Sequence, residues 1–437
     1  MTDVALTSST TDPAGLPVYF VGTRGALFWL ALKTGFLTVI TLGFYRFWMK
    51  TRMRRWFWSA TRPGGHPMEY VGDPWEKLLG FFIAVVILTF YIGIINLVVM
   101  FVSFSVFSSA SVGYLASVVG VIPLWFYAQY RARLYVLART RWRGVRFGLE
   151  KGAWGYAWRA LMHWAITVLT LGVLWPRMTF SLEKYMTDRT YFGSARLHQR
   201  GHWTMLYRAA IPFILSVLIM VAGAIWVFWL DPIVVSADVT TDDIIRSFEE
   251  MMDGGAAAAF PVVEAERLAV FLFAMIGLIY GAIHYRFVSK RQMANHKTTE
   301  GVTLHSRLSG PRVASIYVLG SIIAYLVLVL GIIGLVVFAI LTLGPSAMLG
   351  GAMGDFGAAV DLPKSIAVPL IAAFYLSIFL MWNVLYSTFV TFPLMRHMAK
   401  TLSLPRRHGL QVISQRDRDE FTEAEGFAEA LDLGAAI

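Results

Sequence analysis

The chain of 437 residues contains no cysteine and carries little charge. Without cysteine, disulfide bonds, thiolate zinc sites, iron–sulfur clusters and cysteine nucleophiles are excluded. Charged residues make up 15% and hydrophobic residues 57% of the chain, whereas soluble domains have roughly 25% charged and 45–50% apolar residues. The composition therefore excludes a soluble enzyme, a disordered chain and a disulfide scaffold, and it indicates a membrane protein.

The sequence also lacks the common motifs of soluble enzymes, and its first residues do not resemble a secretory signal. The first seventeen residues have neither the basic start nor the apolar core of a signal, so we expect the first helix to be kept and the N-terminus to be a short disordered lead. No GxxxxGK[ST], HExxH or GxSxG pattern occurs. We therefore expect no enzymatic activity, with no catalytic residues, no cofactor and no metal site.

Six long segments are almost free of charge, and each can cross roughly 30 Å of hydrocarbon as a helix. They are 78–107, 112–130, 206–230, 268–285, 313–341 and 368–390. Two further apolar stretches, 28–48 and 156–175, contain charged or ionisable residues. The predicted fold class is an all-α integral membrane protein with six transmembrane helices plus two half-buried interfacial or re-entrant helices.

Lys and Arg are distributed unevenly over the parts that these spans separate. The parts 1–77, 131–205, 286–312 and 391–437 hold 34 of the 38, whereas 231–267 and 342–367 hold three against eleven Asp and Glu. Because cytoplasmic loops accumulate Lys and Arg, we predict a multi-pass protein of the bacterial inner (plasma) membrane with both termini cytoplasmic. A span at 156–175 would invert every later loop, so we expect that segment to re-enter or to lie in the interface.

These spans and charges divide the chain into seven consecutive parts. The parts are 1–77 with the lead, a half-buried helix and a basic aromatic cytoplasmic segment; 78–130, a transmembrane hairpin; 131–205, a basic cytoplasmic loop with the second half-buried helix; 206–285, a transmembrane pair with an acidic outer loop at 231–267; 286–312, a basic cytoplasmic loop; 313–390, a transmembrane pair; and 391–437, a cytoplasmic tail.

An internal repeat links the two half-buried segments. Thr38-Val-Ile-Thr41-Leu-Gly43 recurs as Thr167-Val-Leu-Thr170-Leu-Gly172, at a constant offset of 129 residues. Each copy is followed by a basic, aromatic-rich stretch and then by a clean span. Because related copies should sit alike, we expect both segments to be half-buried helices at the cytoplasmic face.

Basic residues interleaved with aromatic rings form the most informative pattern. The candidate lipid-binding residues are Arg46, Lys50, Arg52, Arg54 and Arg55 in one cluster and Arg141 and Arg143 in another. Aromatic rings settle at headgroup depth, and each cation attracts anionic lipid with about 1 kcal/mol. The pattern predicts either an orientation signal with an aromatic belt or specific capture of an anionic headgroup. The anchoring spans favour membrane lipids, with a membrane or cytoplasmic protein as a second partner, over nucleic acid.

The interiors of the spans contain few strongly polar residues. Asn96, Gln129 and Asn383 are the candidates for a pore lining. Each either bonds a neighbouring helix or lines a common polar path. Ion-coupled transporters place ionisable groups in the bilayer, and these spans have none away from their ends. We therefore expect a non-enzymatic scaffold or a protein that binds anionic lipid or a partner, with a channel or transporter for a small solute as the alternative.

Three stretches of the chain match the pattern of a known family, namely Phe20-Val-Gly22-Thr23, Thr41-Leu-Gly43-Phe-Tyr45-Arg46-Phe-Trp48 and Arg141-Trp-Arg-Gly144-Val-Arg-Phe147. In these residues the chain resembles the YjgN family of bacterial polytopic inner-membrane proteins. The resemblance continues to the C-terminal Glu425-Gly-Phe-Ala-Glu-Ala-Leu-Asp432 and so covers most of the chain. The resemblance implies a multi-pass location in the inner membrane, and it supplies no catalytic residues.

Overall fold

The computed structural model describes residues 16–107, 110–230, 265–299, 302–343, 364–404 and 413–415. Nearly all of the predicted lead and acidic outer loop and most of the tail lie outside these residues. Six described helices are long and apolar enough to cross a membrane. They cover Pro74–Val106, Ser111–Ala138, Trp203–Leu230, Ala269–Ala294, Gly310–Gly334 and Phe374–Thr401. Each overlaps one predicted span, so the prediction of an all-α membrane protein is confirmed.

The chain divides into two compact units. The larger unit contains the described parts of Met1–Trp203, Arg291–Leu308 and Ser315–Ile437, and the smaller contains those of Thr204–Lys290 and Ser309–Ala314. In the smaller unit, helices α8 (Tyr207–Ile225) and α10 (Ala265–Ala294) approach closely at Gly281, where an added Cβ would lie 2.6 Å from the Phe213 Cα. Every strand and every site discussed below belongs to the larger unit.

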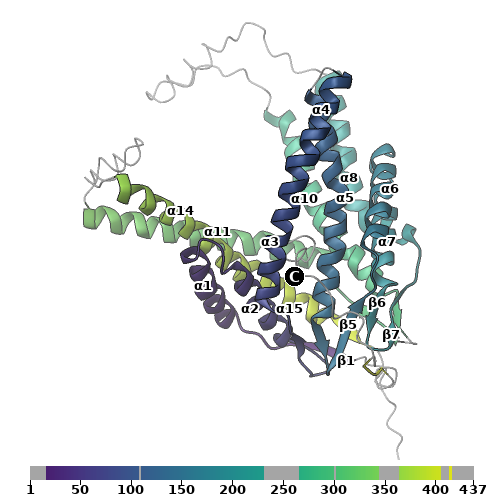
Figure 1. The fold of residues 1–437 in the computed structure, drawn as a ribbon, viewed down its shortest axis with the longest axis horizontal. Coiled ribbons are helices and arrows are strands. Elements are labelled where there is room, and N and C mark those ends of the chain that lie inside the picture. The colour runs from purple at the N-terminus through teal and green to yellow at the C-terminus, as the bar shows by residue number, and fades with distance from the viewer. Residues whose placement is uncertain are drawn as a thin grey trace, which may run out of the picture. The chain divides into compact units, whose positions relative to one another are not determined.

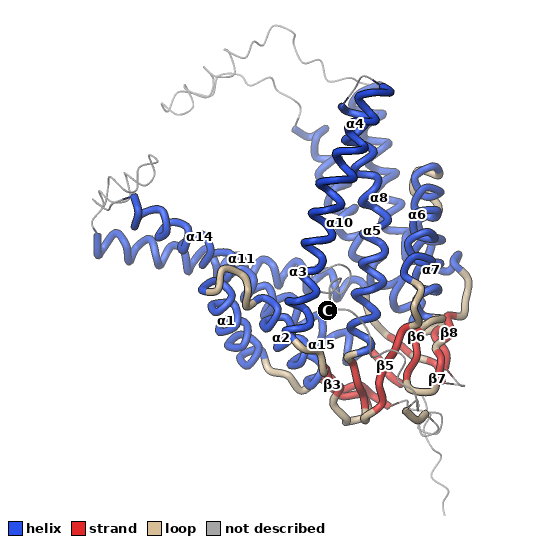
Figure 2. Tube along the Cα trace, in the orientation of Figure 1, coloured by secondary structure: helices blue, strands red, loops and turns tan. Residues whose placement is uncertain are grey.

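Short strands, which the sequence did not predict, occupy the basic segments between the long helices (Figure 2). They are β1 (Leu16–Phe20), β2 (Thr61–Pro63), β3 (Met68–Tyr70), β4 (Thr140–Trp142), β5 (Val145–Leu149), β6 (Thr190–Phe192), β7 (Ala195–Arg196), β8 (His198–Gln199), β9 (Lys297–Thr299), β10 (Val302–Thr303), β11 (His305–Ser306) and β12 (Leu402–Leu404). They form three sheets with the orders β11-β12-β1-β2, β10-β9-β8 and β3-β4-β5-β6-β7.

Five antiparallel strand pairs each enclose one helical segment of the chain. The pairs β1·β2, β3·β4, β5·β6, β8·β9 and β11·β12 mark where the chain leaves the strand region and where it returns. Two further pairs, β4·β5 and β12·β1, join neighbouring segments into larger sheets. The pair β12·β1 brings the C-terminal part of the described chain beside its first strand, with Leu16 opposite Leu404. Both ends of every helical segment are thus tied to the same strand region.

The helices between these pairs differ in length (Figure 1). They are α1 (Arg24–Ile40) and α2 (Arg46–Ala60); α3 (Pro74–Phe90), η1 (Tyr91–Ile95), α4 (Asn96–Phe107) and α5 (Ala110–Ala138); α6 (Ala153–Leu169) and α7 (Trp175–Thr187); η2 (Trp203–Leu206), α8, η3 (Trp226–Leu230) and α10; and α11 (Gly310–Leu343), α14 (Lys364–Tyr386), η4 (Ser387–Thr391) and α15 (Phe392–Thr401). The segments η1, η3 and η4 are π-helical turns within long helices, and η2 is a 3₁₀ turn.

The two stretches predicted as single half-buried helices are helix–turn–helix hairpins. The predicted helix 28–48 ends at Ile40, and a turn leads into α2; the predicted helix 156–175 likewise ends at Leu169 and leads into α7. We call α1–α2 the first hairpin and α6–α7 the second hairpin. The apolar run continues through both turns, which is why hydropathy alone did not locate the breaks.

Both turns are built by the Thr-Leu-Gly sequence. Gly43 and Gly172 have φ angles of +93° and +85°, a left-handed conformation that glycine adopts without strain. The Thr41 hydroxyl accepts a hydrogen bond from the Tyr45 N–H at 2.9 Å, and the Thr170 hydroxyl accepts one from the Leu174 N–H at 3.4 Å. Threonine is therefore the C-cap of the first helix of each hairpin and accepts the N–H of the residue before the second helix, and glycine allows the chain to reverse.

The bases of the hairpins are buried in separate cores. Phe57 of the first hairpin packs with Leu27, Val384 and Phe392. The second hairpin packs on α5 through a tyrosine cluster that includes Tyr130, Tyr156 and Tyr185. Between the sheets, side chains of β1, β4, β6 and β12 surround an apolar cavity of about 210 Å³. The strand region consequently has an apolar interior of its own, although its surface is basic.

Candidate functional site

The cations of α2 are sorted onto different faces by the helical period. Lys50 and Arg54 are four residues apart and share one face, whereas Arg52 and Arg55 are exposed on other faces. Arg52 lies over the Tyr45 ring at 5.6 Å, and Arg55 donates a hydrogen bond to the Gly72 carbonyl at 2.8 Å. Arg46 is exposed on the first turn of the helix. The predicted cluster is therefore not one continuous patch.

Lys50 and Arg54 line a cavity of about 540 Å³ between the first hairpin and the helices α14 and η4. The α1 side contributes Thr38, and Tyr317 of α11 also faces the cavity. The α14–η4 side contributes Asn383 and Ser387. Among the described residues that line it, none is Asp or Glu. The lining thus carries two positive charges together with neutral hydrogen-bonding groups.

The character of the lining changes along the chain from α14 into η4. Its α14 end is apolar, with Leu376, Phe379 and Leu380, and the following turns bring Asn383 and Ser387 and then Thr391. The last two belong to η4, and π-helical turns are frequent at functional sites because they alter the side-chain direction of a helix. The cavity is therefore amphipathic, and this matches a ligand with an apolar part and an anionic part.

Arg54 is held in place by aromatic neighbours and is only 4% exposed. Its guanidinium lies over the Tyr70 ring at 5.2 Å and over the Trp58 ring at 5.9 Å. It also donates a hydrogen bond to the Tyr70 hydroxyl at 3.4 Å. Such cation–π contacts are worth about 2 kcal/mol when desolvated, so they fix the direction of the guanidinium.

The structure places the three candidate pore residues apart. Asn96, at the start of α4, accepts a hydrogen bond from the Ser117 hydroxyl of α5 at 2.5 Å. Gln129 is half-buried on α5. Asn383 is exposed to the cavity and accepts a hydrogen bond from Ser387 of its own helix at 3.4 Å. Only Asn383 joins the basic candidates Lys50 and Arg54, and the sequence did not predict that combination.

The remaining basic candidates lie in the strand region. Arg141 is in β4, where it pairs with Glu69 of β3 and Arg146 of β5. Arg143 occupies the β4–β5 turn with a φ of +54° and lies over the Trp142 ring at 5.8 Å. Arg141 thus lies in a strand and Arg143 in a turn, and neither is among the residues that line the cavity.

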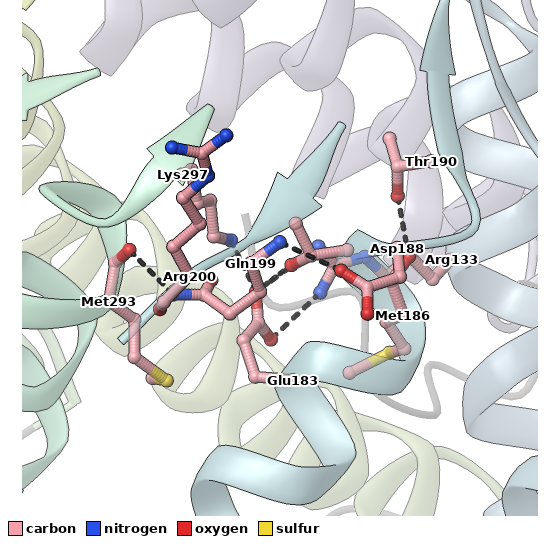
Figure 3. A network of polar contacts seen from close by, with 10 residues as sticks. Arg133, Glu183, Met186, Asp188, Thr190, Gln199, Arg200, Met293 and Lys297 are labelled. Atoms are coloured by element: carbon pink, nitrogen blue, oxygen red, sulfur yellow. Dashed lines mark hydrogen bonds and ion pairs between the residues drawn. The ribbon is translucent and has the colours of Figure 1, made fainter. Parts of the chain in front are cut away.

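A buried ionic cluster holds the second hairpin to the strand region (Figure 3). Glu183 of α7, whose side chain is 19% exposed, pairs with Lys297 of β9 at 2.6 Å and with Arg133 of α5 at 3.3 Å. Nearby, Asp188 accepts a hydrogen bond from the Gln199 N–H at 2.7 Å, and Gln199 donates one to the Met293 carbonyl at 3.0 Å. These contacts connect five elements, namely α5, α7, β8, β9 and α10.

The protonation of Glu183 follows from this cluster. Burial alone would raise the pKa of its carboxyl, but Arg133 and Lys297 together hold the pKa well below its usual range. Glu183 is therefore ionised, and its charge is compensated by two cations. The cluster fits a structural clamp, because Lys297, which also lines the apolar cavity between the sheets, directs its ammonium group to Glu183.

Several residues of the site were not predicted from the sequence. Thr38, Tyr317, Ser387 and Thr391 line the cavity, but in the sequence they lie in largely apolar stretches and carry no charge that would mark a site. The i, i+4 spacing of Lys50 and Arg54 was the one signal that could have separated the cavity face from the exposed face. Among the described residues, no three His, Asp or Glu side chains cluster as metal ligands would.

Comparison with known proteins gives a family and no function. Neither the curated proteins nor the solved structures contain a match to this chain. Residues 15–334 match the family DUF898, described as bacterial protein of unknown function, and the YjgN proteins fall within it. The match covers more than half of the chain and includes both hairpins and the strands β1–β11. The chain therefore belongs to the bacterial family DUF898.

Proposed function

We propose that the chain is a non-enzymatic, multi-pass membrane protein that binds an anionic amphiphile, such as an anionic membrane lipid. The site is the cavity between the first hairpin and α14–η4. The observation that carries this proposal is the pairing of Lys50 and Arg54 with an apolar lining in one cavity. In this proposal the anionic headgroup lies next to these cations. The acyl chain of the lipid packs along Leu376, Phe379 and Leu380.

The dimensions and energetics support such a ligand. Ligand sites enclose roughly 300–1,000 Å³, and the cavity has about 540 Å³. A cation near the membrane surface contributes about 1 kcal/mol toward an anionic lipid. Two cations within one partly closed cavity therefore favour an anionic over a zwitterionic headgroup by about 2 kcal/mol, roughly thirtyfold in affinity.

The proposal includes a location and an orientation. The strand region and both termini face the cytoplasm of a bacterial inner membrane, since Lys and Arg gather in the segments that form the strands. A Cys in place of the exposed His66, between β2 and β3, reacts with an impermeant thiol reagent only after the inner membrane is opened. Reaction of this Cys from the periplasmic side of intact cells would contradict the orientation.

We also treat the two hairpins as copies of one repeated unit. The support is that their turns have matching hydrogen bonds, such as Gly43 N–H to Thr38 carbonyl at 2.8 Å and Gly172 N–H to Thr167 carbonyl at 2.7 Å. The Thr38 and Thr167 hydroxyls lie 3.8 Å from the sulfur atoms of Met49 and Met178, again 129 residues apart. On this view the cavity belongs to the first copy of the unit, the first hairpin, and the second hairpin makes other contacts in its place.

The decisive experiment is native mass spectrometry of the purified protein with phosphatidylglycerol or phosphatidylcholine. Wild type is compared with Lys50→Gln and with Arg52→Gln, which removes one charge from the same helix but from an exposed position. We expect Lys50→Gln to bind phosphatidylglycerol about fivefold more weakly than wild type, because removing one cation removes about 1 kcal/mol of binding free energy. Arg52→Gln should bind as wild type does.

Other results would overturn the proposal. Equal losses in both variants would mean that the basic residues act only as a diffuse belt. The alternative function, a small-solute channel, would be supported by solute flux in vesicles that falls in Asn383→Leu while no lipid is retained. Asn383 is the residue for this test because it faces the cavity.

A further inference from the structure

The turns of the two hairpins expose apolar side chains. Leu42 is 85% exposed and Leu171 is 94% exposed, and each lies in the turn between the two helices of its hairpin. Their neighbours Phe44 and Val173 are also exposed. In water a reverse turn carries polar residues or glycine, because its side chains are solvated. Each of the two hairpins thus has an apolar tip, and exposure of such a tip to water is unfavourable.

The backbone of each tip satisfies its own N–H groups. From Thr41 to Arg46, each N–H donates to an acceptor within the hairpin: the carbonyls of Leu37, Val39, Thr38, Thr41 and Gly43 and the Thr41 hydroxyl. The six N–H groups from Thr170 to Trp175 are satisfied in the same way. An unsatisfied N–H costs several kcal/mol in hydrocarbon, so irregular backbone rarely enters it. These turns meet that requirement for every N–H.

Both tip leucines have strained backbones. Leu42 and Leu171 have φ angles of +51° and +50°, and Arg143 is the other non-glycine residue with positive φ in the described part of the chain. Such a conformation disfavours side chains with a Cβ. Glycine or asparagine would relieve the strain in a solvated turn. Leucine at this position in both turns indicates that the side chain gains more from its surroundings than the backbone loses.

The packing of the first hairpin gives the depth of its tip. Near the tip, Phe44 lies 6.5 Å from Phe82 and Phe47 lies 5.4 Å from Phe81, measured between ring centroids. The helix α3 starts at Pro74, so the tip reaches about 12 Å along this span at 1.5 Å per residue. The hydrocarbon is roughly 30 Å thick. The tip accordingly ends within the leaflet on the side of the strand region.

We propose that the two hairpin tips insert into the acyl chains of one leaflet, the leaflet on the strand side, and stop there. The surface that they fit is the lipid of the protein's own membrane. Leu42 and Leu171 are the inserted side chains, and Tyr45, Trp48 and Trp75, which contact one another in a chain, mark the headgroup level beside them. The inference rests on the tips alone and is independent of what the cavity binds.

The absence of cysteine makes a depth measurement direct. Single Cys variants Leu42→Cys and Leu171→Cys, and His66→Cys as a control in the strand region, are labelled with an environment-sensitive fluorophore and reconstituted in phosphatidylcholine–phosphatidylglycerol vesicles. Lipids with a nitroxide at a shallow or a deep chain position then act as quenchers. We expect blue-shifted emission and strong chain quenching at both tips, at a depth between the headgroups and the midplane, and neither at the control.

Two results would overturn the proposal. Water-like emission at the tips, as at the control, would place them in solvent or against a soluble partner. A depth beyond the midplane, with reaction toward an impermeant thiol reagent on the face opposite His66, would mean that the hairpins span. Because a label at the strained residue can disturb the turn, Phe44→Cys and Val173→Cys provide a second pair beside the tips, where φ is not positive.

Discussion

The first and second hairpins have the same turn but use their second helix in opposite ways. At positions 129 residues apart, α2 carries Arg54 and α7 carries Glu183. Arg54 lines an amphipathic cavity, whereas Glu183 is enclosed by Arg133 and Lys297. Arg54 in the first hairpin therefore lines a cavity that has room for an anionic group. Glu183 in the second hairpin is instead already paired with two cations.

The difference shows which part of the hairpin can vary. The turn must satisfy its backbone and reverse the chain, so Thr and Gly recur at both turns. The second helix has no such constraint beyond its buried side. The first hairpin is the one that lines the proposed ligand cavity, whereas the second is joined by ion pairs to α5 and β9, and variants at matched positions can separate the two roles.

The largest effect is expected at Glu183. Replacing it by Gln leaves Arg133 and Lys297 without their carboxylate, and breaking a buried ion pair costs about 3–5 kcal/mol. The free energy of unfolding, measured by titrating the detergent-solubilised protein with SDS, should fall by about that amount. The control Arg177→Gln removes an exposed charge from the same helix and should change it by less than about 0.5 kcal/mol. Equal effects would show that the cluster is not a clamp.

The same residue predicts a dependence on pH. Glu titrates near pH 4.3 in an unfolded chain, and in the folded protein its pKa is lower. The stability that Glu183 contributes is therefore present above about pH 4.3 and is lost as the pH falls toward the folded pKa. Thermal unfolding of wild type and Glu183→Gln in detergent should differ most at pH 7, and the difference should begin to shrink as the pH falls below about 4.3. A constant difference down to pH 3 would contradict this assignment.

Substitutions of the turn glycines test whether the two turns are equivalent. An added Cβ at Gly43 or Gly172 meets no atom within 4 Å, so the loss comes only from the positive φ and should be about 1 kcal/mol in each. Unfolding by SDS should show equal losses for Gly43→Ala and Gly172→Ala. Gly25→Ala, which also meets no atom within 4 Å but has no positive φ, should show no loss. Unequal losses at Gly43 and Gly172 would show that tertiary contacts, rather than the turn, set the backbone.

The smallest difference is expected for the threonines whose hydroxyl groups accept a hydrogen bond within the turns. Thr41→Val should cost about 1 kcal/mol, since its hydroxyl accepts the Tyr45 N–H at 2.9 Å. Thr170→Val should cost about 0.5 kcal/mol, because the corresponding distance to the Leu174 nitrogen is 3.4 Å. The same SDS titration measures both. A larger loss for Thr170→Val than for Thr41→Val would contradict the inferred order of the two hydrogen bonds.

The sequence predicted the six long helices because each contains an uninterrupted apolar run, which is a local signal. It did not predict the strands, since β2, β4 and β9 have three residues each and cannot show a period. The β4–β5 pair was nevertheless accessible: Arg143-Gly144 between Thr140-Arg-Trp142 and Val145-Arg-Phe147 is a two-residue turn between alternating strands.

The cavity could be predicted only in part. The basic side chains of α2 stand out in the sequence, and their i, i+4 spacing identifies Lys50 and Arg54 as one face. Their opposite wall comes from α14, more than 300 residues later, and no local pattern links Asn383 to α2. Long-range packing therefore determines which polar residues of an apolar span become part of a site.

The strand pairs at the base of each helical segment have a consequence for how the topology is preserved. Each of the five strand pairs brings the chain back to the side on which the helical segment began. Every helical segment therefore crosses the membrane either twice or not at all; the pairs are β1·β2, β3·β4, β5·β6, β8·β9 and β11·β12. A short hairpin could lengthen into a spanning pair, or a spanning pair shorten, without inverting any later segment. Each of the five strand pairs thus separately keeps the number of membrane crossings of its segment even. One segment can therefore change its depth without changing the orientation of the others.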